Sequence, residues 1–263
     1  MRIIVTVKQV PDPEAPQSSF TADRAAKRVA VASSVPAAVS DYDNYATEAA
    51  LRIKDADTDS TVSVVSLGES HVLDVIKRPL AMGADDLFLV QDPDLPNGDP
   101  VTVAAALAAA IRKIGDFDLI LSGRQSSDLD QGIVATALAA ILDIPVLTNA
   151  IAIEASGDEV QIARIVDDGI DTVAARLPAL VTVSNELGQP RYATMRGIMA
   201  ARRVDPTVWG KGDLEAMDAA DPFTQVVDLF APEKSSNVEM IEGETPAEAA
   251  KALALRLREE RLI

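Results

Sequence analysis

The segment from Leu121 to Gly132 holds the residue types and spacing best suited to chemistry in this chain. A short buried strand is predicted to end near Leu121, Gly123 opens a polar turn, and a helix is predicted over Gly132–Leu142. At such a junction, free backbone N–H groups and the positive end of a helix dipole can hold an anion. The segment therefore indicates a nucleotide or phosphate site. An ordinary capped helix start, in which Ser and Asp side chains serve only the backbone, accounts for the same residues.

Two common phosphate motifs are absent from this turn. It lacks the glycine–lysine–hydroxyl end of a Walker A loop, and it is not the dinucleotide motif G-x-G-x-x-G. The first predicted strand, Ile3–Val7, leads into Lys8-Gln9-Val10-Pro11 without a glycine, which disfavours a nicotinamide-linked dehydrogenase. A stand-alone ATP-binding or ATP-hydrolysing protein would need a loop richer in glycine and a carboxylate for Mg²⁺, for which Asp128 and Asp130 are the evident candidates.

Composition narrows the range of functions. The 263 residues include 24 basic and 41 acidic side chains, a net charge of −17, so nucleic acid and anionic membranes are unlikely partners. Without cysteine there are no disulfides or cysteine-ligated clusters, and a single histidine, His71, excludes a multi-histidine metal site. No targeting segment and no apolar run of roughly 18–20 residues is visible, so we expect a cytoplasmic protein.

Short β-branched runs alternate with longer alanine- and leucine-rich helical patterns. This alternation predicts an α/β fold of the Rossmann-like, doubly wound type, with a mainly parallel sheet and helices on both faces. Further strands are expected at Val62–Ser66, Leu87–Val90 and Ala179–Val183, with Val160–Val166 and Thr172–Leu177 paired. Further helices are expected at Ser40–Asp55, Glu69–Ala81 and Val101–Ile114, the last starting at Asp99-Pro100.

Two segments lack a clear period. Residues 8–39 form a long polar connection with several prolines, and residues 204–237 resemble an extended arm. We therefore divide the chain into a nucleotide-binding α/β domain, residues 1–203, and a C-terminal arm and helix, residues 204–263. The final helix begins at Thr245-Pro246-Ala247-Glu248, a capping box with proline at the first helical position. Its apolar stripe must pack either on its own domain or on a partner subunit.

Several motifs, in order along nearly the whole chain, resemble the beta subunits of electron transfer flavoproteins. They are Ile4-Val5-Thr6-Val7-Lys8-Gln9-Val10-Pro11-Asp12, Glu48-Ala49-Ala50-Leu51-Arg52-Ile53-Lys54, Leu80-Ala81-Met82-Gly83-Ala84-Asp85, the loop Gly123–Asp130, Arg164–Gly169 with Leu177–Thr182, and Pro190-Arg191-Tyr192-Ala193-Thr194. The resemblance implies a Rossmann-like subunit that pairs with an alpha subunit, which supplies most of the site for the redox-active FAD. It also implies an electron carrier without substrate chemistry or catalytic residues of its own.

In this family the beta subunit binds a second nucleotide, AMP in most members and a second FAD in electron-bifurcating members. The resemblance places this site on Thr6, Lys8, Ser40, Asp41, Tyr42, Asp43, Leu67, Gly123, Arg124, Gln125, Ser126, Ser127, Asp128, Leu129, Asp130, Gln131, Gly132, Ile133 and Val134. A flavin ring gains from aromatic stacking, and no aromatic residue lies in the loop 123–134, which favours AMP over FAD. The alternative of an electron-bifurcating subunit with its own FAD stays open.

The resemblance also implies a docking segment. Residues 190–203 correspond to the loop through which the family binds acyl-CoA and related dehydrogenases, before electrons pass to a quinone-linked or other acceptor. The candidate docking residues are Arg191, Tyr192, Met195 and Arg196, with Met195 as the apolar anchor. A flexible thioether suits a surface that meets several partners. A solvated loop with Met195 folded into the core is the simpler alternative.

Overall fold

The computed structural model describes residues 1–92, 99–214, 224–232 and 238–263. The strands are β1 (Arg2–Thr6), β2 (Gln9–Pro11), β3 (Phe20–Asp23), β4 (Arg28–Val31), β5 (Ala37–Val39), β6 (Thr61–Gly68), β7 (Asp86–Gln91), β8 (Leu119–Gly123), β9 (Val146–Ser156), β10 (Glu159–Val166), β11 (Gly169–Arg176), β12 (Ala179–Val183) and β13 (Thr207–Trp209). The helices are α1 (Asp41–Ala56), α2 (Leu73–Ile76), α3 (Arg78–Met82), α4 (Pro100–Ile114), α5 (Val134–Leu142), α6 (Met195–Ala201) and α7 (Pro246–Glu259), with short 3₁₀ turns η1 (Gln17–Ser19), η2 (Asn185–Leu187) and η3 (Lys211–Asp213).

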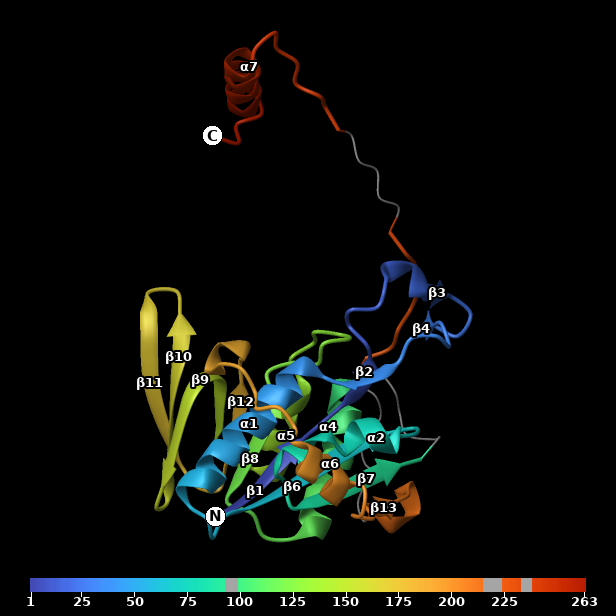
Figure 1. Ribbon diagram of the computed structural model, residues 1–263, viewed down its shortest axis with the longest axis vertical. Helices are drawn as coiled ribbons and strands as arrows, with labels where there is room; N and C mark the ends of the chain where they lie inside the picture. The colour runs from blue at the N-terminus through green and yellow to red at the C-terminus, as the bar shows by residue number, and fades with distance from the viewer. Residues whose placement is uncertain (93–98, 215–223, 233–237) are drawn as a thin grey trace.

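One large sheet, in the order β11-β10-β9-β12-β8-β1-β6-β7-β13, carries the fold (Figure 1). The seven strands β9-β12-β8-β1-β6-β7-β13 each pair in parallel with the next strand in this order. β10 pairs antiparallel with both β9 and β11. The predicted pairing of β10 with β11 is therefore confirmed. The sequence analysis did not predict β9, which joins this hairpin to the parallel part of the sheet.

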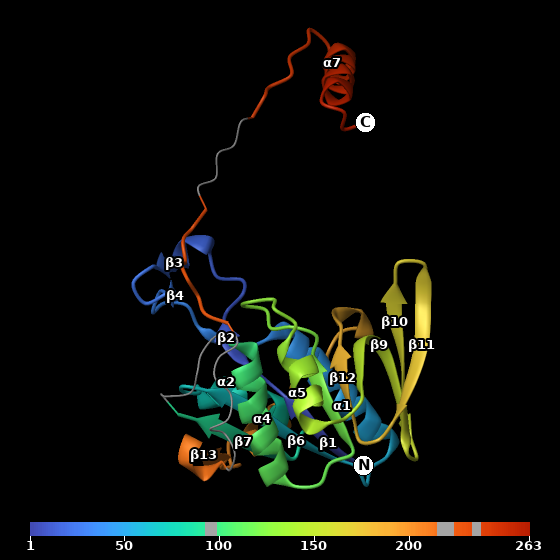
Figure 2. The ribbon, with the colours of Figure 1, turned by 180° about the vertical axis from the view of Figure 1, so that it is seen from behind.

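Alternate residues of the central strands face different helical layers. On β1, Ile3 and Val5 pack in the cluster that includes α1 and α3, whereas Ile4 packs against α4 and α5. Figure 1 shows α1 over one face of the sheet, and Figure 2, turned by 180°, shows α4 and α5 over the other. Burial on both faces explains why these strands read as continuous apolar runs. The predicted doubly wound fold is confirmed.

The strand order reverses at β1. From β1 the chain winds outward through β6 to β7, and α4 then returns it to β8 on the other side of β1. In open α/β sheets, ligands bind outside the carboxyl ends of the strands at such a switch point. The fold therefore brings the ends of β1 and β8 to the position where a ligand is expected.

The long polar connection 8–39, for which the sequence analysis predicted no strands, contains two small antiparallel sheets. β2 pairs with β5, which places Gln9 opposite Val39, and β3 pairs with β4, which places Phe20 opposite Val31. Strands of three or four residues with few buried side chains show little apolar alternation. Their pairing is therefore invisible in the sequence.

Two helix predictions were wrong in their bounds. The helix expected over Glu69–Ala81 is broken into α2 and α3, because Pro79 has no backbone N–H to continue the ladder. The helix expected from Gly132 begins instead at Val134, because the backbone of Gly132, at φ +65°, is left-handed. Because β8 also ends two residues later than predicted, at Gly123, the loop after β8 keeps its predicted length and is shifted along the chain.

The predicted helix starts at Asp99 and Thr245 are confirmed. Asp99 accepts a hydrogen bond from the backbone N–H of Thr102 at 2.9 Å, and Thr245 accepts one from Glu248 at 3.3 Å. The second carboxylate oxygen of Asp99 accepts from the backbone N–H and the hydroxyl of Thr224, at 3.0 and 2.8 Å. Burial raises the pKa of Asp99, but these hydrogen bonds outweigh it and hold the pKa at about 2. Asp99 therefore ties the C-terminal segment to the sheet domain.

The chain after Arg203 differs in part from the expected extended arm. β13 adds a strand to the sheet by pairing with β7, and residues 215–223 and 233–237 of the expected arm lie outside the described residues. Figure 1 shows α7 apart from the sheet domain. No residue of α7 is buried, and Leu253 and Leu255 are 46% and 55% exposed. In this chain alone, the apolar stripe of α7 does not pack on its own domain.

No helix in the described ranges is long and apolar enough to span a bilayer.

Candidate functional site

Side chains from three elements meet at the carboxyl ends of β1 and β8. We call this region the β1–β8 junction; it consists of the ends of the two strands, the first turn of α1 and the loop 124–133. The hydroxyl of Thr6, at the end of β1, donates to the hydroxyl of Ser122 on β8 at 2.8 Å. Both side chains are buried. The bond joins strands that are far apart in the sequence at the switch point of the sheet.

Asp43, in the first turn of α1, links the two strand ends. Its carboxylate accepts hydrogen bonds from the backbone N–H groups of Lys8 at 2.7 Å and Gly123 at 3.2 Å. The residue is only 5% exposed. Burial raises the pKa of Asp43 to about 7, although the two N–H donors act in the opposite direction. A carboxyl group that titrates near neutral pH therefore lies at the centre of the junction.

Gly123 allows α1 to approach the end of β8 closely. A Cβ at this position would lie 2.5 Å from Oδ1 of Asp43 and 2.7 Å from Cβ of Tyr42. Separations this short are not tolerated between real atoms, so a larger residue would force α1 and β8 apart. The glycine of the predicted polar turn is thus required by packing against α1.

The side chain of Lys8 forms an ion pair across the junction. Its Nζ atom lies 2.8 and 2.7 Å from the two carboxylate oxygens of Asp128. In the same loop, the backbone N–H of Ser127 donates to the hydroxyl of Ser40 at 3.3 Å, and Ser40 is fully buried before α1. The loop after β8 is therefore fastened to both β1 and α1.

Arg124 and Tyr42 form the side of the junction nearest β12. The guanidinium of Arg124 lies 5.0 Å from the centre of the Tyr42 ring, and it donates to the hydroxyl of Ser184 at 3.4 Å. Farther along the loop, Gln125 donates to Asp130 at 2.8 Å. These contacts give the loop a defined shape before any ligand is present.

Three buried polar atoms of the junction lack a hydrogen-bond partner within the described chain. They are Nε of Arg124, Oγ of Ser127 and Oδ1 of Asn44. A buried polar group without a partner costs about 1–3 kcal/mol, so native structures rarely leave several together. Two donors and an acceptor of this kind fit a polar ligand such as a nucleotide.

The structure brings most of the predicted site residues together, with one change in their arrangement. Arg124–Ile133 separate β8 from α5, which agrees with the polar turn expected between the strand and the following helix. The helix start that lies against Gly123 belongs to α1. The predicted residues gathered at or bordering the junction are Thr6, Lys8, Ser40, Asp41, Tyr42, Asp43, Gly123, Arg124, Gln125, Ser126, Ser127 and Asp128.

The remaining predicted residues belong to the outer part of the loop or lie just beyond the junction. Leu67 is the second-last residue of β6, the strand beside β1, and packs on the core around α4. Leu129 and Ile133 are 50% and 45% exposed, and Val134 is the first residue of α5. The left-handed backbone of Asp130 and Gly132 turns the outer part of the loop. The other predicted residue of this outer part is Gln131.

The sequence analysis missed Asn44, Ser122 and Ser184. Ser122 precedes Gly123 on β8, Ser184 directly follows β12, and Asn44 lies one residue after Asp43 on α1. A systematic search for the first polar residues at the carboxyl end of each predicted parallel strand finds both serines. Asn44 has no such signal, because its position depends on the direction of α1.

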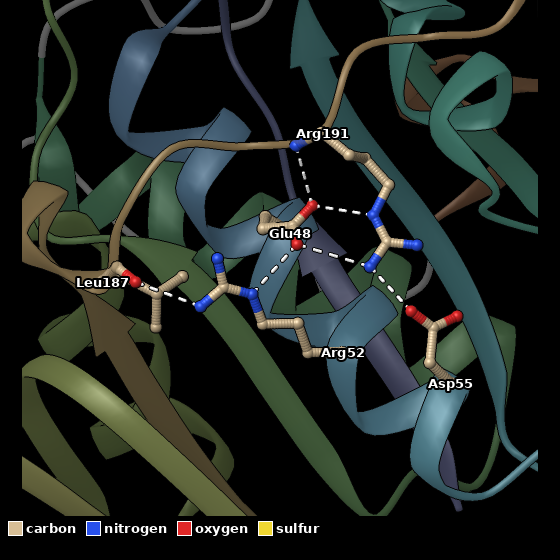
Figure 3. A network of polar contacts seen from close by, with 5 residues as sticks. All are labelled: Glu48, Arg52, Asp55, Leu187 and Arg191. Carbon is tan, nitrogen blue, oxygen red and sulfur yellow. Dashed lines mark hydrogen bonds and ion pairs between the residues drawn. The ribbon is translucent and has the colours of Figure 1, made fainter.

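The predicted docking residues lie away from the junction, around the start of α6. Tyr192 and Met195 are 89% and 75% exposed, and Arg196 is exposed as well. Met195 is therefore not folded into the core. Arg191 differs from these three, because its guanidinium is bound by Glu48 and Asp55 of α1 (Figure 3).

Two other features bear on the chemistry. A cavity of about 840 Å³, bordered by Met1, Arg52, Asp118 and Pro178, lies at the opposite, amino-terminal ends of the strands. Among the described residues, no group of three or more His, Cys, Asp or Glu side chains is placed to hold a metal ion. The two carboxylates considered for Mg²⁺ are bound to Lys8 and Gln125 instead.

Comparison with known proteins gives consistent results. A family model described as the electron transfer flavoprotein domain matches residues 28–214. The chain is 34% identical to the caffeyl-CoA reductase-Etf complex subunit CarD of Acetobacterium woodii over 100% of both chains. It is also 34% identical to the electron transfer flavoprotein subunit beta of Megasphaera elsdenii, over 90% of this chain and 89% of that one. The subunit beta of Bacillus subtilis is 33% identical over 84% and 86%.

Proposed function

Because this chain belongs to the electron transfer flavoprotein beta subunit family, we propose that it binds one AMP at the β1–β8 junction within a heterodimeric electron carrier. The alpha subunit of that heterodimer supplies most of the site for the redox-active FAD. The protein's own contribution is to position nucleotides and to bind partners, which requires no acid–base or nucleophilic residues.

The three unpartnered polar atoms of the junction carry the nucleotide proposal. Arg124 and Ser127 offer donors to a phosphate, and Asn44 offers an acceptor to an amino or hydroxyl group. They lie at the switch point of a doubly wound sheet, where such ligands bind. Lys8 adds a cation at the same strand end once Asp128 releases it.

The contacts of Tyr42 favour AMP over a second flavin. Tyr42 is the aromatic residue of the junction that could stack on an isoalloxazine ring, but the guanidinium of Arg124 lies over its face. A phosphate bound to Arg124 would leave this stack intact, whereas a flavin ring would have to displace it. A small nucleotide therefore fits the existing arrangement better.

We propose that the exposed residues around the start of α6 bind dehydrogenases. Tyr192, Met195 and Met199 are 89%, 75% and 50% exposed, an uncommon grouping of large apolar side chains on a protein of net charge −17. Arg196 adds a positive charge beside them. This surface suits an acyl-CoA or related dehydrogenase with an apolar pocket and an acidic rim, and electrons then pass on to a quinone-linked or other acceptor.

The nucleotide content of the complex tests the main proposal. The chain is coexpressed with its alpha subunit, the heterodimer is denatured, and released nucleotides are separated and quantified. One AMP and one FAD per heterodimer are expected. In the variant Ser127→Ala, AMP should decrease while FAD stays at one, since this change removes only a donor of the junction. A heterodimer without AMP or a second nucleotide would refute the proposal.

A second candidate is an electron-bifurcating subunit that binds its own FAD. The similarity to CarD, which spans both chains completely and whose name places it in a reductase–Etf complex, favours this possibility. Two FAD and no AMP per heterodimer, with two separate flavin reduction potentials, would establish it in place of the AMP-binding carrier.

A further inference from the structure

We propose that Glu48 is a positioning residue that fixes residues 188–196, which include the start of the predicted docking segment 190–203, and that Arg191 acts within its own chain rather than on a partner. The inference rests on the docking role proposed above for Tyr192 and Met195. It assigns a task to a buried carboxylate that the nucleotide site does not use.

The carboxylate of Glu48 binds Arg191 at three points (Figure 3). Its Oε2 atom accepts from the backbone N–H of Arg191 at 3.0 Å and from Nε at 2.8 Å, and Oε1 accepts from Nη2 at 3.3 Å. The main chain and the side chain of Arg191 are thus held by one carboxylate. Charge-assisted bonds of this kind are about twice as strong as neutral ones.

Glu48 also acts on the other end of the segment through Arg52. Its Oε1 atom accepts from Nε of Arg52 at 2.9 Å, and Nη1 of Arg52 donates to the carbonyl oxygen of Leu187 at 3.0 Å. Residues 187 and 191 are therefore both fastened to one turn of α1. The intervening bend includes Gly188, whose φ is +101°.

Burial makes Glu48 the centre of this network. Its side chain is 6% exposed, compared with 32% for Arg191 and 63% for Asp55, which binds Arg191 from outside at 2.8 Å. Although burial alone raises the pKa of Glu48, hydrogen bonds from Arg191 and Arg52 lower it below its ordinary value. A buried carboxylate with two arginine partners remains ionised and strongly bound at neutral pH.

A second anchor lies on the far side of the exposed residues. A Cβ on Gly197 would overlap the carbonyl oxygen of Ala81, so the start of α6 packs directly on α3. Between the Glu48–Arg191 contact and this helix contact, residues 192–194 form neither helix nor strand. The two anchors therefore hold Tyr192 and Met195 on the outer face, and the guanidinium of Arg191 is already occupied.

The test uses the heterodimer and an acyl-CoA dehydrogenase reduced by its acyl-CoA substrate. The variants are Glu48→Gln, Arg191→Ala and the double variant. Asp55→Asn is the matched control, because it removes the other carboxylate that binds Arg191, and this carboxylate is exposed. We measure kcat and the apparent KM for the heterodimer, and amide hydrogen exchange over residues 188–196. Arg191→Lys, a milder change, replaces Arg191→Ala if that variant does not fold.

Glu48→Gln and Arg191→Ala should each raise KM roughly tenfold with little change in kcat, as expected when a bond to a charged group is lost. The double variant should add no further effect, because both changes remove the same contact. Amide exchange should rise over residues 188–196 but not over β1 or β8. Asp55→Asn should change KM less than about twofold, because exposed ion pairs contribute little.

Three results would overturn the inference. If Arg191→Ala raises KM and Glu48→Gln does not, Arg191 contacts the partner itself. If exchange over residues 188–196 is unchanged in Glu48→Gln, the carboxylate does not order the segment. A further variant, Met195→Ala, tests the docking role on its own. If it leaves KM unchanged, the exposed residues do not bind the dehydrogenase, and the inference fails because the docking role on which it rests is wrong.

Discussion

Nζ of Lys8 lies 2.8 and 2.7 Å from the two carboxylate oxygens of Asp128, so the cation at the end of β1 is paired before a nucleotide arrives. A phosphate that binds Lys8 must displace this carboxylate and face its negative charge. The ion pair therefore opposes binding while it holds the loop in place. Both side chains are partly exposed, at 39% and 23%, so the opposing effect is modest.

Removal of the Asp128 charge should strengthen nucleotide binding. In Asp128→Asn, Lys8 is free to bind phosphate, and the affinity of the heterodimer for AMP should rise roughly two- to fivefold. Titration calorimetry on nucleotide-stripped protein measures the change. Asp130→Asn is the control, because Asp130 binds Gln125 instead of Lys8. A weaker affinity in Asp128→Asn would mean that Asp128 itself contacts the nucleotide.

Gly123→Ala should damage both stability and the site. The new methyl group would lie 2.5 Å from Asp43 and 2.7 Å from Tyr42, and the overlap should cost about 1–3 kcal/mol in the free energy of unfolding. Urea unfolding and the AMP content of the heterodimer report the two effects. Gly212→Ala provides the control, because a Cβ there meets no atom within 4 Å. Equal stability of the two variants would contradict the close approach of α1 to β8.

Ionisation of Asp43 should make the chain less stable as the pH rises toward neutrality. Burial raises the pKa of Asp43 from 3.8 to about 7, so the folded state holds this proton more tightly than the unfolded state. Its contribution to stability is complete below about pH 4 and is lost as the pH rises through 7. The loss should be on the order of a few kcal/mol.

The comparison of wild type with Asp43→Asn isolates this effect. The free energy of unfolding is measured in urea at several pH values from about 4 to 8. The difference between the two proteins should change across this window and become constant above it. Parallel pH profiles would show that Asp43 has an ordinary pKa in the folded chain, and that its two N–H donors offset the effect of its burial.

The apolar stripe of α7 should be needed for pairing with the alpha subunit. Leu255 is 55% exposed and lies on a helix without buried residues, so Leu255→Glu should leave the unfolding of this chain unchanged. The same variant should reduce the yield of heterodimer, because a carboxylate in an apolar interface costs several kcal/mol unless it is paired. Lys251→Ala, on the same helix, is the control. Normal assembly of Leu255→Glu would mean that α7 does not contact the partner through Leu255.

The doubly wound fold was predictable because the chain repeats one local pattern. Strands such as β1 and β8 are buried on both faces and read as short apolar runs, and Asp99 and Thr245 mark helix starts by their own side chains. The break at Pro79 was equally local, but the apolar pattern on either side concealed it. Features that depend on backbone pairing with little burial, such as β2 with β5, left no comparable signal.

The candidate site was predictable only in outline. The sequence by itself determined which residues lie near the carboxyl ends of buried strands, because side-chain type and period are local properties. Only the tertiary structure decided that Lys8 binds Asp128 across 120 residues, and that Arg191 binds Glu48 across 143. Such partners depend on the order of strands in the sheet and on the direction of α1. The reason is physical: contacts between distant segments arise when the whole core packs, and no short stretch of sequence contains both sides of them.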